Sequence, residues 1–469
     1  MRTRICLLLG TVLVLAACAG PRPEAPTAAG VTPPEGWRGT AAQPGAEVSA
    51  TWWQAFGDPA LTAVVEQALA NNTDVAIAAA RVEEARAQFR LAQSQRLPQV
   101  DATGGGGPQR TVNAFGVDTS QTVGQAQLSV SYDADLFGRL AQASAAARAQ
   151  LLATEAARDN VRLAVAASAA SGYIGLRALD ARLAVLRDTL ELRRVSLQLA
   201  RRRAEAGYAS MLDQRQAEAE YAAAEALIPT TELAISRQEN ALSLLLGENP
   251  RAIARGLSLD ALQAPDTPAA LPAELLRRRP DITQAEQSVV AADRSLDSAR
   301  AAFMPSIRLS AAGGFAATTL LPDPFSVYSI GASILAPIFE GGRLNAQQDA
   351  AAARRNQAAF AYRKAALTAF REVEDSLAAV DRVARQEQVI ETQRAAVAEA
   401  LRLATNRYRA GYSPYLEQLD AQRALLSTEL ALVQARSDRL AASVSLYQAL
   451  GGGWSGEMLT ASVRAPGGN

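Results

Sequence analysis

Two cysteines and the absence of histidine limit the chemistry that this chain can perform. Without histidine the chain lacks the usual general base near neutral pH and the commonest metal ligand, which excludes catalytic triads and imidazole metal sites. The sequence also lacks a glycine-rich phosphate loop and a nucleophile elbow. Cys6 falls in an apolar N-terminal run, so a mature chain would keep one thiol, Cys18, and no internal disulfide. We therefore expect no enzyme activity, no cofactor and no metal site, although a hydrolase using only carboxylates stays open.

Cys18 is predicted to be a lipid attachment site. Two arginines precede an apolar run at residues 5–17, which is too short to span a bilayer and is typical of a secretory leader. Residues 15–18 read Leu-Ala-Ala-Cys and resemble the bacterial lipobox, in which cleavage before the cysteine is followed by acylation of its sulfur and nitrogen. Several acyl chains hold a protein on a membrane more firmly than one chain does. By the same resemblance, Ala19 in place of aspartate predicts delivery to the outer membrane.

The segment after this cysteine differs in composition from the rest of the chain. Proline, alanine and glycine dominate residues 19–50, which predicts an extended tether after a signal peptide at residues 1–17, so that the lipidated tether covers 18–50. The whole chain has 47 basic and 47 acidic residues. This balance gives no attraction to nucleic acid, and no nucleic-acid partner is expected.

The remainder consists of two copies of one unit. Four short motifs recur at an offset of 207 or 204 residues. The pairs are Asn72-Thr73-Asp74-Val75 with Arg279-Pro280-Asp281-Ile282, Arg96-Leu97-Pro98 with Phe303-Met304-Pro305, Gly138-Arg139-Leu140 with Gly342-Arg343-Leu344, and Ala206-Gly207-Tyr208 with Ala410-Gly411-Tyr412. We expect a first repeat at 51–250, a central linker at 251–272, a second repeat at 273–454 and a C-terminal tail at 455–469.

Each repeat is expected to contain a helix, two strands, a very long helix and a further helix. Residues 140–206 and 344–410 lack proline and are rich in helix-forming residues. At 1.5 Å per residue, each would be about 100 Å long. Two heptad rows, one with Leu183, Leu190 and Leu197 and the other with Val185, Leu192 and Leu199, lie about 200° apart around the helix. Such a helix requires neighbours on two sides, which predicts a cylinder of helices, while a helix buried in a globular bundle stays open.

The expected strands lie at residues 99–111, 122–137, 306–319 and 325–339. Apolar and polar residues alternate strictly from Gln125 to Leu136, which is typical of a transmembrane barrel strand but also of a half-buried soluble strand. Unpaired strand edges are not stable in hydrocarbon, and the smallest bacterial barrels have about eight strands. Four strands from one chain are too few, so we expect several copies to share one barrel.

Several motifs resemble those of a known family over essentially the whole mature chain. They are Trp52-Trp53 with Phe56, Asp58-Pro59, Leu245-Leu246-Gly247, Arg279-Pro280-Asp281-Ile282, Tyr132–Arg139 (YDADLFGR) and Pro337–Arg343 (PIFEGGR). Together they resemble the NodT branch of the TolC and OprM outer-membrane efflux family. The resemblance implies a mainly α fold with a small β part: a trimeric α-helical barrel, or tunnel, continued by a shared 12-stranded transmembrane β-barrel. It places the protein in the outer membrane, lipid-anchored, with a periplasmic tunnel.

The same resemblance implies a functional site at the two helix turns. In the family, acidic residues six and nine positions after the turn glycine surround the periplasmic aperture. The corresponding acidic residues in this chain are Glu417, Asp420 and Asp213. The turn residues Gly207, Tyr208, Gly411 and Tyr412 would contact a periplasmic adaptor protein. Three arginines before the turns, Arg203, Arg407 and Arg409, are predicted to latch the aperture by pairing with Asp213 or Glu417.

The predicted function is therefore the exit duct of a tripartite export system. The expected partners are two further copies of the chain, outer-membrane lipid, a periplasmic adaptor protein and an inner-membrane pump of the RND class. A lipid-anchored coiled-coil scaffold without a pore is the alternative, and it predicts no membrane strands. The exported substrate is left open among drugs, metal ions, oligosaccharides and siderophores.

Overall fold

The computed structural model describes residues 21–38, 48–112, 115–116, 118–266 and 272–454. The predicted leader, the lipidation residue Cys18 and the C-terminal tail lie outside the described residues. The chain forms two compact units, the first from residues 1–31, 80–155 and 284–364 and the second from residues 32–79, 156–283 and 365–469. None of the helices in the described ranges combines the length and apolarity needed to cross a membrane.

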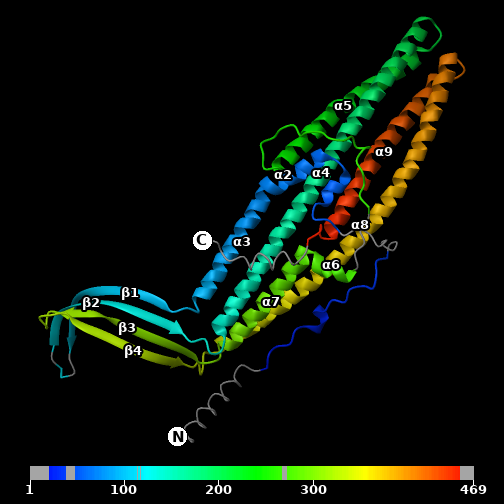
Figure 1. The fold of residues 1–469 in the computed structure, drawn as a ribbon. Coiled ribbons are helices and arrows are strands. Elements are labelled where there is room, and N and C mark those ends of the chain that lie inside the picture. The colour runs from blue at the N-terminus through cyan, green and yellow to red at the C-terminus, as the bar shows by residue number, and fades with distance from the viewer. Residues whose placement is uncertain (1–20, 39–47, 113–114, 117, 267–271, 455–469) are drawn as a thin grey trace. The chain divides into compact units, whose positions relative to one another are not determined.

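The described part is mainly helical, with one small sheet (Figure 1). Its elements are η2 (Thr27–Ala29), η3 (Trp52–Phe56), α2 (Pro59–Asn71), α3 (Thr73–Ser94), β1 (Gln99–Val112), β2 (Asp118–Asp133), α4 (Arg139–Glu205), α5 (Met211–Leu245), α6 (Pro272–Arg278), α7 (Pro280–Ala301), β3 (Ser306–Thr318), β4 (Phe325–Leu335), α8 (Arg343–Ala410) and α9 (Tyr415–Ala449). The predicted order therefore occurs twice, as α3-β1-β2-α4-α5 and as α7-β3-β4-α8-α9.

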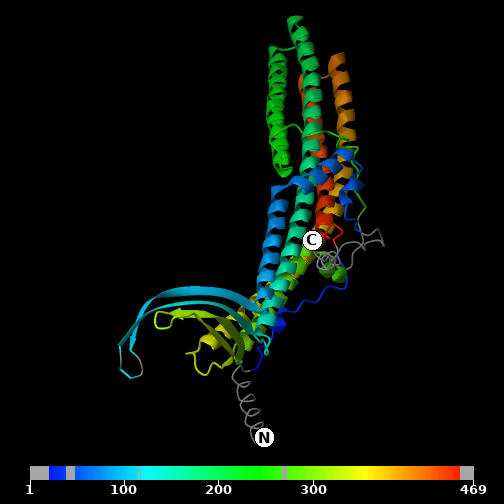
Figure 2. The ribbon, with the colours of Figure 1, turned by 60° about the vertical axis from the view of Figure 1, so that its left-hand side comes forward.

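The sheet of the first unit separates apolar from polar side chains. Its strands are antiparallel in the order β1-β2-β3-β4, and Figure 2 shows them as one curved sheet. Directly paired residues lie on the same face, so the register aligns the alternation of all four strands. One face has Val100, Ala102, Leu128, Val130, Tyr132, Leu309, Ala311, Phe315, Tyr328, Ile330 and Ile334. The other has Gln99, Asp101, Thr103, Gln125, Gln127, Ser129, Ser131, Arg308, Ser310, Ser329 and Ser333. The separation holds in the middle of the sheet and is broken toward the strand ends, where Arg110, Asp118 and Ser326 share the apolar face and Val123, Phe325, Val327 and Leu335 share the polar face.

Two strands end earlier than the sequence pattern predicts, at Asp133 and Leu335 instead of residues 137 and 339. In the first repeat the chain turns to start α4, because the Asp135 carboxylate accepts hydrogen bonds from the amides of Leu140 at 3.0 Å and Ala141 at 2.6 Å. The alternation of apolar and polar residues continues to Leu136, but residues 134–138 already lead into the start of α4.

Equivalent residues of the two repeats cap equivalent helices in the second unit. The Asn72 side chain donates to the carbonyl of Leu245, the last residue of α5, at 2.9 Å. Arg279, at the corresponding position of the second repeat, donates to the carbonyl of Ala449, the last residue of α9, also at 2.9 Å. The last carbonyls of a helix have no partner within the helix, so each cap satisfies one of them. The two sequence repeats therefore also share this helix-capping hydrogen bond.

Arg279 should contribute more to stability than its neighbour Arg278. Its guanidinium is buried and also pairs with Asp281 at 2.7 Å and Glu372 at 2.8 Å. Arg279→Leu should destabilise the protein by roughly 2–4 kcal/mol, because two carboxylates and one carbonyl lose their donor. Melting followed by circular dichroism should show a lower midpoint. Arg278→Leu removes only a helix-surface pair with Glu274 at 3.5 Å and should shift the midpoint little; equal shifts would contradict this account.

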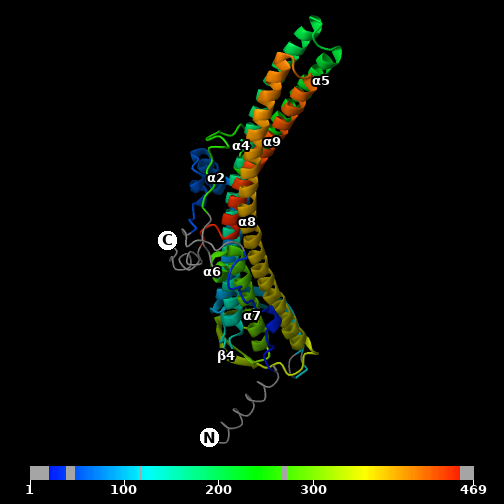
Figure 3. The ribbon, with the colours of Figure 1, turned by 90° about the vertical axis from the view of Figure 1, so that its right-hand side faces the viewer.

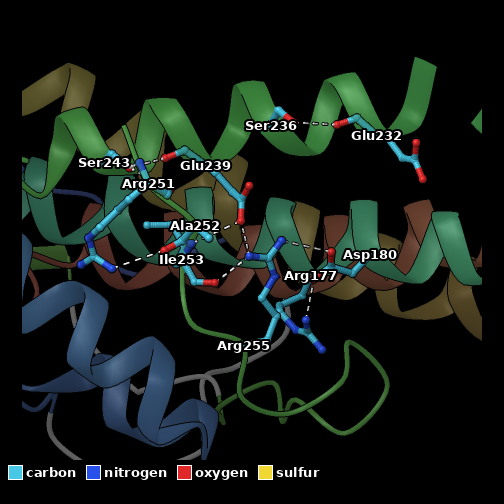
Figure 4. Close-up of polar contacts among 10 residues, drawn as sticks. All are labelled: Arg177, Asp180, Glu232, Ser236, Glu239, Ser243, Arg251, Ala252, Ile253 and Arg255. Atoms are coloured by element: carbon cyan, nitrogen blue, oxygen red, sulfur yellow. Dashed lines mark hydrogen bonds and ion pairs between the residues drawn. The ribbon is translucent and has the colours of Figure 1, made fainter. Parts of the chain in front are cut away.

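The predicted central linker is attached to the second unit by charged side chains. Figure 4 shows Arg255 of this segment between α4 and α5, where it pairs with Asp180 at 3.2 Å and with Glu239. The Arg251 amide donates to the Ser243 hydroxyl of α5 at 3.1 Å. Segment 249–266 is thus held against both helices although it has no regular secondary structure.

A large apolar core lies in the second unit. It joins η3, α2 and the middle of α4 to parts of α5, the linker and α9. Its centre is aromatic: Trp52 stacks on Tyr447 with ring centroids 5.6 Å apart, and Trp52 also contacts Phe56 edge-on. Trp52 and Phe56 belong to the motif that begins the first repeat, so the role of this motif in the structure is to pack the core.

Candidate functional site

The two hairpins of the second unit, α4–α5 and α8–α9, end in turns of the same geometry (Figure 1). The turn glycines Gly207 and Gly411 have φ angles of 75° and 80°, a conformation that glycine adopts without steric cost. In each turn the next amide donates to the carbonyl five residues earlier, at 2.8 Å and 2.9 Å. The tyrosines after the glycines, Tyr208 and Tyr412, are 85% and 81% exposed. The predicted contact residues are therefore at the surface of the described chain.

Close to the turns, the hairpins pack together through a small apolar cluster. Tyr408 of α8 and Tyr415 of α9 lie with ring centroids 5.5 Å apart, beside Leu197 of α4 and Leu419 of α9. Burial raises the pKa of Tyr415 to about 12, and the nearby Glu220 charge adds to this shift. Both tyrosines stay neutral at physiological pH and act as packing groups.

Arg203 connects the two hairpins directly. Its guanidinium donates to the carbonyl oxygens of Tyr408 and Arg409, both at 2.7 Å, and lies 4.6 Å from the centre of the Tyr408 ring. A cation at the C-terminus of a helix is favourable because the last carbonyls carry partial negative charge. Within one chain, Arg203 therefore binds the end of α8 and not the carboxylates with which the sequence analysis paired it.

The other predicted latch and aperture residues lie close together but interact weakly within one chain. Arg407 and Glu417 approach to 3.6 Å as a solvent-exposed pair, and such pairs contribute about 0–1 kcal/mol. The exposed Arg409 side chain makes no hydrogen bond or ion pair with the described part of the chain. Asp420 is exposed, 3.9 Å from Arg423. Exposed carboxylates near the tip thus remain available to a partner or an ion.

Asp213 occupies the helix start in the first repeat. Its amide donates to the hydroxyl of Ser210, the residue that caps α5, at 3.2 Å, and its carboxylate lies in the first turn of that helix. A carboxylate in the first turn of a helix is favourable in its own right. Across the described ranges, no group of three or more histidine, cysteine, aspartate or glutamate residues is placed to hold a metal ion.

A buried polar layer between the hairpins was missed in the sequence analysis. Glu220 of α5 pairs with Arg193 of α4 at 3.0 Å and with Arg423 of α9. Burial lowers the pKa of Arg193, and Glu220 opposes this effect. Nearby, the Ser196 hydroxyl accepts hydrogen bonds from the Gln422 amide at 2.9 Å and from the Gln418 amide at 3.3 Å. A sequence feature could have revealed this layer, because Arg193 interrupts an otherwise apolar heptad row of α4.

Comparisons with known proteins agree with this architecture. The family model described as "Outer membrane efflux protein" matches residues 64–248 and 271–452. The pyoverdine export outer membrane protein OpmQ of Pseudomonas aeruginosa is 36% identical over 460 residues, with 95% of this chain and 96% of that protein covered. The probable efflux pump outer membrane protein TtgC of Pseudomonas putida is 37% identical over 444 residues, covering 92% of this chain and 91% of TtgC.

A solved structure shows the same similarity in three dimensions. The MtrE outer membrane channel of Neisseria gonorrhoeae, in its open state, superposes with a TM-score of 0.82 at 30% sequence identity, covering 92% of this chain and 98% of MtrE. The family match includes both repeats, and the structural match extends over 92% of the chain. The chain belongs to the outer membrane efflux protein family.

Proposed function

We propose that three copies of this chain form one outer-membrane exit duct, which passes substrates delivered by an inner-membrane pump through a periplasmic adaptor. The observation on which this proposal depends is the sheet. In the middle of its four strands, mainly apolar side chains lie on one face and mainly polar side chains on the other. A barrel wall between lipid and an aqueous lumen requires this separation.

The sheet of one chain is too small for a pore. β1 and β4 are its outer strands, and each leaves one edge without a partner in the described chain. In hydrocarbon each unsatisfied backbone group costs several kcal/mol, which makes open edges unstable. Three copies that pair β1 of one chain with β4 of the next would form a closed barrel of 12 strands from three sheets of four. Pairing between copies is thus the simplest way to satisfy both edges.

The tips would then form the periplasmic end of the duct. Around a threefold axis, three copies of Glu417 and Asp420 would create a ring of negative charge, which attracts cations and excludes anions. Arg409 is exposed two residues before the turn glycine Gly411 in each chain. If the guanidinium paired with Asp213 or Glu417 of a neighbouring copy, the predicted latch would join the copies and hold the aperture closed.

The tips also offer a surface for the adaptor. Tyr208 and Tyr412 project from hydrogen-bonded glycine turns, and Met211 and Leu212 next to the first turn are exposed as well. Exposed apolar and aromatic side chains at fixed positions are typical of protein-binding surfaces. An adaptor protein of an RND-class pump is the proposed partner, and acylated Cys18 is the proposed lipid anchor.

Arg409→Ser should raise the closed-state conductance of single channels in planar bilayers several-fold, because it removes the proposed latch without disturbing a contact within the described chain. Arg402→Ser is the matched control, since Arg402 lies seven residues earlier on the same face of α8 and pairs with Glu399, on its own helix, at 2.6 Å. The control should leave the conductance unchanged. An unchanged closed-state conductance in Arg409→Ser would refute the latch hypothesis. A purified protein that never conducts would favour the scaffold without a pore.

A further inference from the structure

Residues 21–38, which we call the strap, are part of the predicted extended tether, and they are attached to the helices. Figure 3 shows this dark-blue segment beside α7 and α8. At its start, Arg22 pairs with two carboxylates of α7, Asp293 at 2.7 Å and Asp297 at 3.1 Å. These residues are four apart, so both carboxylates lie on one face of α7.

Two arginines of α8 bind the main chain of the strap in the first unit. Arg355 is only 3% exposed, and it donates to the carbonyl oxygens of Pro23 at 2.9 Å and Glu24 at 2.5 Å. Arg363 donates to the carbonyl oxygens of Ala28 and Gly30, the second at 3.2 Å. Four carbonyls of the strap are thus bound by two guanidinium groups eight residues apart on one helix.

The end of the strap is attached in the second unit. The Arg38 amide donates to the Glu374 carboxylate of α8 at 2.8 Å. The preceding Trp37 ring lies 6.4 Å from the Phe370 ring, a distance typical of aromatic contact. Together with Arg355 and Arg363, these residues place four strap contacts along one helix.

The chemistry of both sides explains why these contacts are specific. A proline-rich extended chain makes no internal ladder of hydrogen bonds, so its carbonyls need other donors. Arginine offers five donors in a planar fork and retains its charge when buried. A guanidinium as buried as that of Arg355 needs acceptors, and the strap supplies two of them. The contacts are thus complementary, not incidental.

We propose that the strap is a fixed connection between the acylated N-terminus and α8, so that only a short flexible segment separates the lipid from the helices. This inference rests on the proposed lipidation of Cys18. A flexible tether of about 30 residues has an end-to-end distance of roughly 30 Å, whereas about four residues between Cys18 and Arg22 allow roughly 10 Å. The strap therefore restricts the distance between the acyl chains and the helical part of the protein.

A nitroxide label at Thr27→Cys tests this proposal in the full-length lipidated protein. Thr27 is exposed, so the label does not replace a contact, and the sulfur of acylated Cys18 cannot react with the label. Electron paramagnetic resonance of the detergent-purified protein should show the slow-motion spectrum of an immobilised label. Replacing both arginines, Arg355→Met with Arg363→Met, should shorten the rotational correlation time of the label several-fold. The control pair, Arg354→Gln with Arg371→Gln, changes exposed arginines of the same helix and should leave the spectrum slow.

The outcomes separate the strap from the proposed duct. A fast-motion spectrum in the protein without the arginine changes, or a slow-motion spectrum after Arg355 and Arg363 are both replaced, would overturn the proposal. Two labels per chain would show that Cys18 has a free thiol, and this result would refute the claim that the strap connects a lipid anchor to α8. Conductance measured on the same samples reports on the duct independently, since replacing Arg355 and Arg363 should leave the duct intact.

Discussion

Arginine in place of Ile330 should prevent stable insertion of the protein into the outer membrane. Ile330 of β4 is 85% exposed in the single chain and lies on the apolar face of the sheet. On the lipid side of a barrel, an arginine near the middle of the bilayer costs about 2–4 kcal/mol, and each trimer would contain three. We expect the heat-resistant trimer on unheated gels, and the conductance in planar bilayers, to be lost or strongly reduced.

Ser329→Arg is the matched control for this prediction. Ser329 is the neighbouring residue, also exposed, but it lies on the polar face that would line the lumen. A lumen substitution changes selectivity more than stability, so the trimer should form and its cation preference should decrease. A water-soluble scaffold would tolerate both arginines alike, since both positions face solvent there. Equal tolerance would therefore refute the membrane assignment of the sheet.

Gly256→Ala should destabilise the protein strongly, although it adds only one methyl group. An added Cβ would lie 2.0 Å from Oδ1 of Asp58, whose side chain is 1% exposed. That carboxylate accepts hydrogen bonds from the Ala60 amide at 2.7 Å, the Tyr173 hydroxyl at 3.0 Å and the Leu257 amide at 3.1 Å. The methyl group must break part of this buried network, which we expect to cost roughly 3–4 kcal/mol.

A second glycine provides the control for this substitution. A Cβ at Gly175, in α4, would lie 3.8 Å from the Gln238 amide nitrogen, an ordinary contact. Alanine in a helix is favoured over glycine by roughly 0.5–1 kcal/mol, so Gly175→Ala should leave the melting midpoint unchanged or slightly raised. Circular dichroism of the purified variants should show a midpoint lower by several degrees only for Gly256→Ala. Equal midpoints for both variants would contradict the role assigned to Asp58.

The repeated architecture was predictable because it depends on local patterns. The glycine at residue 207 and its counterpart at 411 mark the turns, and the proline-free runs before them predict α4 and α8 to within a residue or two. The strand positions followed from alternation of side chains. Strand ends did not, because the Asp135 cap stops β2 while the alternation continues, and a cap depends on geometry that polarity does not encode.

Contacts between distant segments were not predictable from one sequence. Composition predicts an extended tether at residues 18–50, but not that Arg355 and Arg363 bind the carbonyls of its strap, because main-chain acceptors leave no trace in the sequence. Arg203 was expected to pair with a carboxylate, but within the chain it caps α8. The Glu220 layer was also missed, because a single arginine in an apolar heptad row is its only sign in the sequence. Lipidation at Cys18, the trimer and the roles of the tip residues stay predictions.

The mass of the detergent-solubilised protein, measured by native mass spectrometry, tests the central claim most directly. One chain has too few strands to satisfy its own sheet edges in a bilayer, so we predict a single species with the mass of three lipidated chains. A stable species with the mass of one chain, recovered from the outer membrane with its sheet intact, would contradict this claim.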